Sequence, residues 1–184
     1  MSFENEWREV TLGDIAEGSD GAVDGPFGSN LKASYYQVSG IPIIRGSNLS
    51  VGLTEFDESE FVFVGDDTFN KLKRSECVKG DIIFTKKGTL GQTGFIKENS
   101  KFSRYLLSSN QMRLRVDTSI ADPEYIYYLV SSRESVDKIK QDSEFTGVPK
   151  INLDYLKKFP VKLPSLSSQK SSVKVLSGLT NKIA

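Results

Sequence analysis

The chain has 184 residues, with 24 Lys or Arg, 24 Asp or Glu, no His and one cysteine, Cys77, so its formal net charge is zero. Because histidine is the commonest general base and zinc ligand near neutral pH, Ser-His-Asp triads and HExxH zinc sites are excluded. One cysteine cannot form an internal disulfide or a Cys-rich metal site, and the length favours one domain plus a short appendage whose core needs neither.

The N-terminal sequence MSFENEWREV lacks the basic start and apolar run of a signal peptide. No apolar stretch approaches the ~20 residues of a membrane span. We therefore expect a soluble, cytoplasmic protein without membrane contact. Within WREVTLGDI, the spacing of Trp7, Val10, Leu12 and Ile15 predicts a short strand and a turn packed on the core. Residues 17–36 are rich in glycine and predict a long loop, which in a compact domain is typically mobile or functional.

The next segments alternate short apolar runs with turn residues, as strands do. IPIIRG (41–46) and FVFV (61–64) predict two strands. Asp66 or Asp67 is the predicted cap of a short helix that continues to Leu72.

A hairpin is predicted in the middle of the chain. GDIIFT (80–85) is typical of a buried strand, KKGTLGQTG (86–94) of a tight connection, and GFI of the strand that follows. Residues 111–116, QMRLRV, alternate apolar and polar side chains, which predicts a half-exposed strand with a basic outer face.

Helices are predicted after residue 120. Asp122 followed by Pro123 is a strong helix start, and the apolar spacing continues this helix through Ile139. Prolines prevent a long helix within residues 147–166. From Ser167 to Ala184 a proline-free helix is expected, with a narrow apolar seam formed by Val173, Leu176, Thr180 and Ile183. This seam fits pairing with another chain, and the alternative is a helix folded back on its own domain.

The zero net charge conceals a segregation along the chain. Residues 1–70 carry 3 basic and 13 acidic side chains, residues 71–115 carry 11 and 3, and residues 116–184 carry 10 and 8. The basic middle block fits a polyanion partner. The alternative is that its charges pair with the acidic first third after folding.

Catalytic signals are weak. Gly88, Gly91 and Gly94 lack the Gly-Lys-Ser/Thr ending of a P-loop and the complete GxGxxG pattern, so a turn is favoured over a nucleotide-binding loop. Asp81 near Lys86 and Lys87 is the closest approach to a metal-dependent nuclease site. The residues therefore predict a binding protein with no catalytic residue and no metal.

A series of motifs in a fixed order resembles one half of a type I restriction-modification specificity subunit, over nearly the whole chain. The motifs are WREVTLGDI, GPFGSNLK (25–32), IPIIRGSNL (41–49), GDIIFTKKGTLGQTGFI (80–96), GVPKINLDYLKKFPVKLP (147–164) and SLSSQ (165–169).

The resemblance implies a non-catalytic subunit that reads double-stranded DNA and associates with a methyltransferase subunit and, through it, the restriction subunit. S-adenosylmethionine, ATP and Mg²⁺ would belong to those partners, and this chain would hold no cofactor. The expected fold is an α/β (α+β) target recognition domain over residues 1–164, with a mixed, twisted, partly barrel-like sheet and flanking helices. Residues 165–184 would begin a coiled-coil-type dimerisation or spacer helix, so that two copies of this half-subunit pair and read a bipartite site.

Sixteen residues are candidate DNA contacts. Those suited to neutralising phosphates are Lys71, Lys73, Arg74, Lys86, Lys87, Lys101 and Arg104. Those suited to base readout are Ser29, Asn30, Lys32, Arg45, Gln92, Asn110, Gln111 and Arg113. Thr89, on the predicted hairpin turn, is the remaining candidate DNA contact. Two other functions stay open at this point: the DNA-binding domain of a nuclease or methyltransferase, and a protein-interaction scaffold that binds no DNA.

Overall fold

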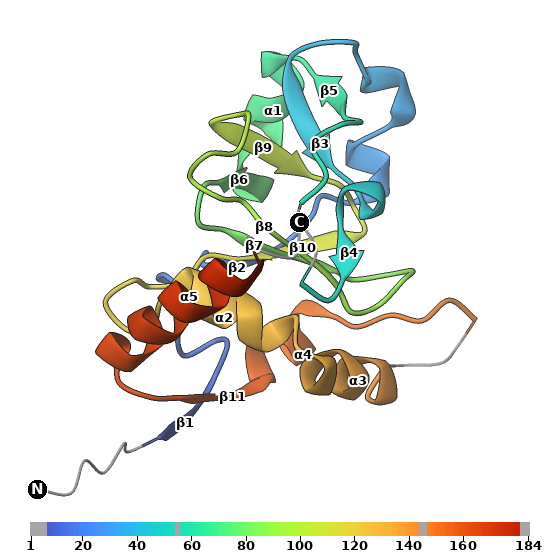
Figure 1. Cartoon of the computed structure of the whole chain (residues 1–184). Helices are drawn as coiled ribbons and strands as arrows, with labels where there is room; N and C mark the ends of the chain where they lie inside the picture. The colour runs from blue at the N-terminus through green and yellow to red at the C-terminus, as the bar shows by residue number, and fades with distance from the viewer. Residues whose placement is uncertain (1–6, 54–55, 144–146, 181–184) are drawn as a thin grey trace, which may run out of the picture.

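Figure 1 shows the computed structural model, which describes residues 7–53, 56–143 and 147–180. Its strands are β1 (Arg8–Thr11), β2 (Ala22–Asp24), β3 (Ile41–Ile44), β4 (Ser50–Val51), β5 (Val62–Val64), β6 (Glu76–Val78), β7 (Ile82–Thr85), β8 (Gln92–Phe95), β9 (Arg104–Leu107), β10 (Gln111–Leu114) and β11 (Pro160–Leu163). Its α helices are α1 (Asp66–Lys71), α2 (Pro123–Val130), α3 (Arg133–Gln141), α4 (Leu153–Lys158) and α5 (Leu166–Thr180). Short 3-10 turns lie at η1 (Gly28–Asn30), η2 (Ala33–Tyr35), η3 (Gly46–Asn48) and η4 (Lys73–Ser75).

These strands divide among three sheets. β1 pairs with β11, five antiparallel strands take the order β2-β10-β7-β8-β4, and four strands take the order β5-β3-β9-β6, in which β3 and β9 are parallel. The mixed α and β architecture expected from the sequence is confirmed. The expectation of one partly barrel-like sheet is wrong, because the described strands are only two to four residues long and stack as separate layers without closing into a barrel.

Apolar side chains on both faces of the strands explain this layering. Within β7, Ile82 and Phe84 point to a core shared with the helices, whereas Ile83 points to a second core between the two larger sheets. A third core, which includes Phe69 of α1, covers the far face of the four-stranded sheet. Burial of each such side chain contributes about 1.5–3 kcal/mol relative to exposure, so both faces of the two larger sheets are covered.

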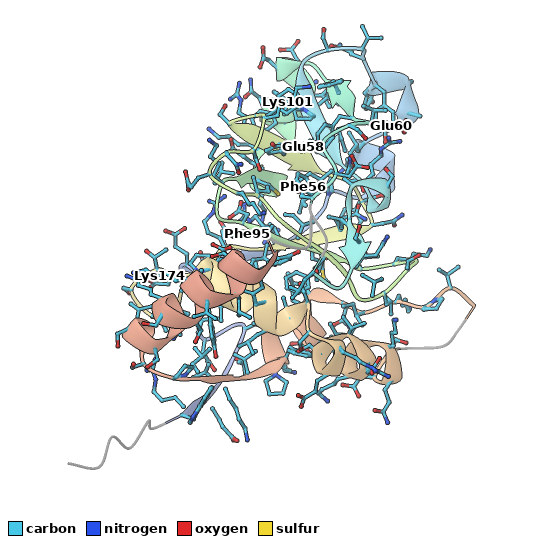
Figure 2. All side chains as sticks on the ribbon, in the orientation of Figure 1. Phe56, Glu58, Glu60, Phe95, Lys101 and Lys174 are labelled. Carbon is cyan, nitrogen blue, oxygen red and sulfur yellow. The ribbon has the colours of Figure 1, made fainter. Side chains whose placement is uncertain are left out.

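Aromatic rings close the outer side of the second core. Tyr105 of β9 contacts the rings of Phe56, Phe61 and Phe102 at centroid distances of 5.8–5.9 Å. Its hydroxyl donates to Glu58, which also accepts from the backbone N–H of Lys101 (Figure 2). Burial, followed by the hydrogen bond to Glu58, raises the pKa of Tyr105, so the phenol stays a donor. These contacts fix residues 56–60 against β9.

Several predicted elements are confirmed with corrections. The predicted loop over residues 17–36 contains β2, because Ala22–Asp24 pairs with β10. The predicted helix over residues 122–139 is two helices: Asp122 caps α2 as expected, and the chain is interrupted at Ser131 before Ser132 caps α3. The cap of α1 is Gly65 instead of an aspartate, and Asp66 and Asp67 lie in its first turn.

The α5 helix begins one residue before the predicted start and lies on α2 (Figure 1). Gln169 is fully buried, accepts from the backbone N–H of Asp122 and donates to the carbonyl of Pro164, both at 2.9 Å. Val173 of the predicted seam packs against the core under the helices. The start of α5 therefore follows the alternative of a helix folded on its own domain, and the coiled coil stays a prediction.

Two positions of the predicted seam, Ile183 and the side chain of Thr180, lie outside the described residues. Among the described helices, none is both long enough and apolar enough to cross a membrane.

Candidate nucleic-acid interface

A polar cleft of about 570 Å³ lies where the connections after β3, β7 and β9 meet. Its lining consists of Tyr36, Arg45, Gly46, Ser47, Thr85, Lys87, Gly88, Thr89, Gln92, Ser108, Ser109, Asn110 and Gln111. Six of the sixteen candidate DNA contacts, from three separate parts of the sequence, are brought together here: Arg45, Lys87, Thr89, Gln92, Asn110 and Gln111. We call this site the polar cleft.

The lining of the polar cleft is cationic. Arg45 and Lys87 are its charged residues, and no carboxylate is among the lining residues that the structure describes. Hydroxyl and amide groups make up most of the remaining polar surface. Two positive charges without a carboxylate in the described lining favour an anionic ligand.

Arg45 is held in place by the turn that follows β3. Its backbone N–H donates to Asn48 Oδ1 at 2.9 Å, and its carbonyl accepts from the Asn48 N–H at 3.0 Å. Asn48 is buried and donates from Nδ2 to the carbonyls of Asp57 and Glu60. The sequence IPIIRGSN therefore forms a fixed turn that presents the Arg45 side chain to the polar cleft.

Lys87 lies in the connection between β7 and β8, which a distant segment supports. The Gly88 N–H donates to the Pro149 carbonyl at 3.2 Å, and the Ile151 N–H donates to the Lys86 carbonyl at 2.9 Å. Gly88 has a φ of +112°, a conformation that glycine adopts without strain. The predicted hairpin is confirmed. Residues 147–151 support its connection through these two hydrogen bonds.

Two glutamines of the polar cleft have structural hydrogen bonds. Gln92 accepts from Thr85 Oγ1 at 3.1 Å and donates to the carbonyls of Gly46 and Leu49 at 3.2 and 3.0 Å. Gln111 is 1% exposed and accepts from the Ser108 hydroxyl. These contacts give both glutamines a positioning role, and their predicted contact with bases stays a prediction.

The predicted basic outer face of residues 111–116 is wrong. Arg113 is 4% exposed and donates to the backbone carbonyls of Glu76 and Asp20, because the second sheet covers this face of β10. Arg115 forms two 2.8 Å hydrogen bonds with the fully buried Asp81. Those hydrogen bonds raise the pKa of Arg115, so it remains charged. Asp81 is therefore a structural partner of this arginine.

Another group of predicted phosphate contacts lies away from the polar cleft, near α1, η4 and the start of β9. The exposed side chain of Arg74 pairs with Asp20, and Arg104 pairs with Asp66 while lying 4.8 Å from the Phe69 ring centroid. Lys101 lies in the upper part of the molecule in Figure 2. Lys71 and Lys73 are exposed on α1 and η4. None of these five residues lines the polar cleft.

The glycine-rich segment borders the polar cleft. The Gly25 N–H donates to the Gln111 carbonyl at 2.9 Å, and Tyr36 contributes to the lining. Ser29, Asn30 and Lys32 are exposed between these two points. Sequence reasoning missed Tyr36 and the serines at 47, 108 and 109, although Ser47 lies within the IPIIRGSNL motif and Tyr36 follows GPFGSNLK closely.

The charge-pairing alternative has partial support. Four basic residues of the middle block pair with acidic residues of the first third: Arg74 with Asp20, Lys86 with Asp24, Arg104 with Asp66 and Arg115 with Glu17. Lys86 is thereby engaged at 3.0 Å, whereas its neighbour Lys87 lines the polar cleft. Within the described residues no group of three or more metal-ligating side chains is found.

Comparisons with known proteins agree on one kind of protein. A family described as "Type I restriction modification DNA specificity domain" matches residues 4–184. The type I restriction enzyme MjaVIII specificity subunit of Methanocaldococcus jannaschii is 24% identical over 153 residues, which cover 78% of this chain and 34% of that protein.

Solved structures show the same fold. A chain in the structure of a type I R-M system has a TM-score of 0.69 at 15% identity and covers 100% of this chain and 40% of its own length. The type I S subunit from M. genitalium gives 0.64 at 15% identity, covering 98% and 41% of the two chains. The HsdS subunit from Thermoanaerobacter tengcongensis gives 0.60 at 14% identity, covering 100% and 39%. The chain thus spans about two fifths of these structures and a third of the curated relative.

Proposed function

The chain belongs to the type I restriction modification DNA specificity domain family, and from this premise we propose that it recognises a sequence in double-stranded DNA through the polar cleft and the connections around it. The polar cleft carries this proposal: it gathers six candidate contacts, two of them cations, and its described lining has no carboxylate. Such a surface suits a polyanion, and its amides and hydroxyls suit hydrogen bonds to DNA.

Recognition by this chain serves partner enzymes. It directs a methyltransferase subunit and, through that subunit, a restriction subunit to the recognised site. S-adenosylmethionine, ATP and Mg²⁺ act in those partners, and the chain itself catalyses no reaction. The sequence contains no histidine, which removes the commonest general base.

Two copies of the chain pair through α5, and the pair reads a symmetric bipartite site. Supporting this, an apolar groove of about 460 Å³ runs between α2 and α5, lined by Tyr128, Leu129 and Val175 among others. Val175 is 64% exposed on α5. Because the burial of apolar surface away from water is favourable, this face suits a second helix.

Mapping methylated sites tests the function as a whole. The chain is expressed with its methyltransferase subunit, and modified bases in cellular DNA are located by sequencing. We expect one bipartite motif with identical, inverted halves. An asymmetric motif would instead indicate a second, different recognition domain, and unmethylated DNA would remove the directing role. Cleavage or methyl transfer by the purified chain alone would contradict the non-catalytic assignment.

A protein-interaction scaffold is the second candidate. The four ion pairs between the basic middle block and the acidic first third favour it, because they neutralise part of the charge that DNA would need. A scaffold of this kind binds no duplex at low salt, even with the methyltransferase subunit present. Fluorescence anisotropy with a labelled duplex at about 50 mM salt, where phosphate contacts are strong, separates the two functions.

A further inference from the structure

The Arg45 side chain has hydrogen-bonding capacity that the described residues do not use. Its Nε atom is buried and has no acceptor. Arg113 also has an unpartnered Nε, but its terminal nitrogens donate to two backbone carbonyls inside the protein. Arg45 instead lines the polar cleft. A buried donor without an acceptor is unfavourable. The terminal nitrogens of the same guanidinium are not among the buried unpartnered atoms, so they can donate to a ligand that supplies oxygen atoms in the polar cleft.

The shape of the site favours one part of DNA over another. Base edges lie at the floor of the grooves and are reached by elements that protrude from a protein, such as a helix or a β-ribbon. The phosphates form the ridges between the grooves. A concave site therefore receives a ridge more readily than a groove floor, and the polar cleft is concave, with a volume of about 570 Å³.

The chemistry of the lining agrees with its shape. A guanidinium binds a phosphate through two parallel N–H···O hydrogen bonds, and Arg45 is positioned by the turn at Asn48 to offer such a fork. Lys87 adds a second positive charge, and Ser47 and Thr89 add hydroxyl groups. Gln92 already donates to two carbonyls of the protein, so it supports the wall without competing for the ligand.

We propose that the polar cleft is a phosphate-binding site and that Arg45 holds one phosphodiester of the DNA backbone in it. This inference rests on the proposed function and deepens it. It differs from the sequence-based hypothesis that Arg45 reads a base. Base readout then falls to connections that border the polar cleft, among them the η1 turn with its exposed Ser29 and Asn30.

The test compares Arg45→Gln and Arg45→Lys with the wild-type full chain. Binding to a target duplex, taken from the methylation map, and to a scrambled duplex is measured by anisotropy over a range of salt concentrations. We expect Arg45→Gln to weaken both complexes by about tenfold, to leave their ratio unchanged, and to lower the slope of log K against log salt by about 1. Arg45→Lys keeps the charge but loses the fork, so its salt slope stays near that of the wild type while its affinity falls.

Duplexes that carry a single neutral methylphosphonate locate the phosphate. One position should weaken the wild-type complex and have no effect on Arg45→Gln, because the contact is already lost. Arg133→Gln is the matched control, since the Arg133 side chain is 96% exposed on α3 and does not line the polar cleft. Circular dichroism confirms that each variant is folded.

Three results would overturn the inference. If Arg45→Gln abolishes the preference for the target at an unchanged salt slope, Arg45 reads a base, and the proposed function stands. If Arg45→Gln binds both duplexes as the wild type does, the polar cleft does not hold the backbone. If the wild-type chain binds no duplex at low salt, alone or with its methyltransferase subunit, the inference and the proposed function fail together.

Discussion

Lys86 and Lys87 are adjacent in sequence but differ in their surroundings. Lys86 Nζ lies 3.0 Å from Asp24 Oδ1 and is partly buried, whereas Lys87 is exposed at the polar cleft. We predict that Lys87→Ala weakens binding to every duplex and lowers the salt slope by about 1. Lys86→Ala should mainly lower the free energy of unfolding, by about 0.5–1 kcal/mol, because it removes a partly exposed ion pair. Salt-dependent anisotropy and urea unfolding measure the two effects.

Lys158→Ala controls for the loss of one positive charge, because Lys158 pairs with Asp154 on α4, outside the polar cleft. An unchanged salt slope in Lys87→Ala would remove the connection between β7 and β8 from the interface.

The ion pair between Asp81 and Arg115 contributes to the stability of the fold. Asp81 is fully buried and also accepts from the Val78 N–H at 2.8 Å, while the Arg115 side chain is 31% exposed. We predict that Asp81→Asn lowers the free energy of unfolding by about 2–3 kcal/mol, somewhat less than for a fully buried pair, because water partly solvates Arg115. Urea unfolding measures the loss. The double variant with Arg115→Met should recover part of it, and additive losses would show that the two side chains are not coupled.

At the scale of elements, the alternation in β10 is predictable from sequence but the environment of its outer face is not. Met112 and Leu114 face the core under the helices, as the period of two indicates. Arg113 faces the four-stranded sheet, and only the tertiary arrangement places a buried sheet there. Local sequence has no signal for a second layer, so the alternating pattern predicts an exposed basic residue where the structure buries one.

Short strands are hard to predict for a related reason. β2 has three residues inside a glycine-rich loop, and its pairing with β10 depends on a partner about 90 residues later. The central strand β9 is likewise absent from the sequence-based prediction. By contrast, Asp122 with Pro123 is a sufficient local signal for the start of α2, because the cap and the first turn are adjacent in sequence.

Gln169 connects α5 to α2. It satisfies the N–H of Asp122 and the carbonyl of Pro164, and both bonds are sheltered from water. We predict that Gln169→Leu, which keeps the approximate volume, lowers the free energy of unfolding by about 2–4 kcal/mol because two backbone groups lose their partners. Lys170→Leu, at the exposed neighbour, should change stability by less than about 0.5 kcal/mol. Equal effects of the two variants in urea unfolding would contradict this role.

Gly25 allows the glycine-rich segment to approach the turn between β9 and β10. A Cβ atom at this position would lie 1.9 Å from the Ser108 carbonyl oxygen, so the backbone would have to move. We predict that Gly25→Ala costs about 2–3 kcal/mol of stability and also weakens DNA binding, because Ser108 lines the polar cleft.

Gly178→Ala is the control for this substitution. Gly178 lies within α5, and a Cβ atom added there would meet open space, so alanine should stabilise the helix by about 0.5–1 kcal/mol. Thermal unfolding of both variants measures the two changes in stability, which we expect to have opposite signs. Destabilisation by both alike would show that the close approach at Gly25 is not the cause.

At the scale of the whole molecule, α5 has an inner and an outer face. Val173 packs on the core, whereas Val175 is 64% exposed beside the groove with α2. We predict that Val175→Glu leaves the fold intact and lowers self-association, and that Val173→Glu unfolds the helix from its domain because it buries a charge. Sedimentation at several concentrations, with circular dichroism, separates these effects. A wild-type chain that is monomeric throughout would contradict pairing through α5.

The location of the site is only partly predictable from charge. The basic middle block contains Lys87, Asn110 and Gln111, but the polar cleft also draws Tyr36, Arg45 and Ser47 from the acidic first third. The parallel pairing of β3 with β9 brings these residues together, because it places the ends of both strands at the same edge of the sheet. Composition along the chain does not encode such a pairing. The basic middle block and the polar cleft therefore share only some of their residues.

Residues 147–151 support the connection between β7 and β8. This support affects how the DNA recognition proposed for the chain can be changed by engineering. Because Gly88 and Lys86 hydrogen-bond to Pro149 and Ile151, a graft that exchanges residues 86–91 alone between homologues separates two segments that fold together. The transferable unit is discontinuous, with one part on each side of α2 and α3. A chimera that exchanges both parts keeps the connection between β7 and β8 together with the segment that hydrogen-bonds to it.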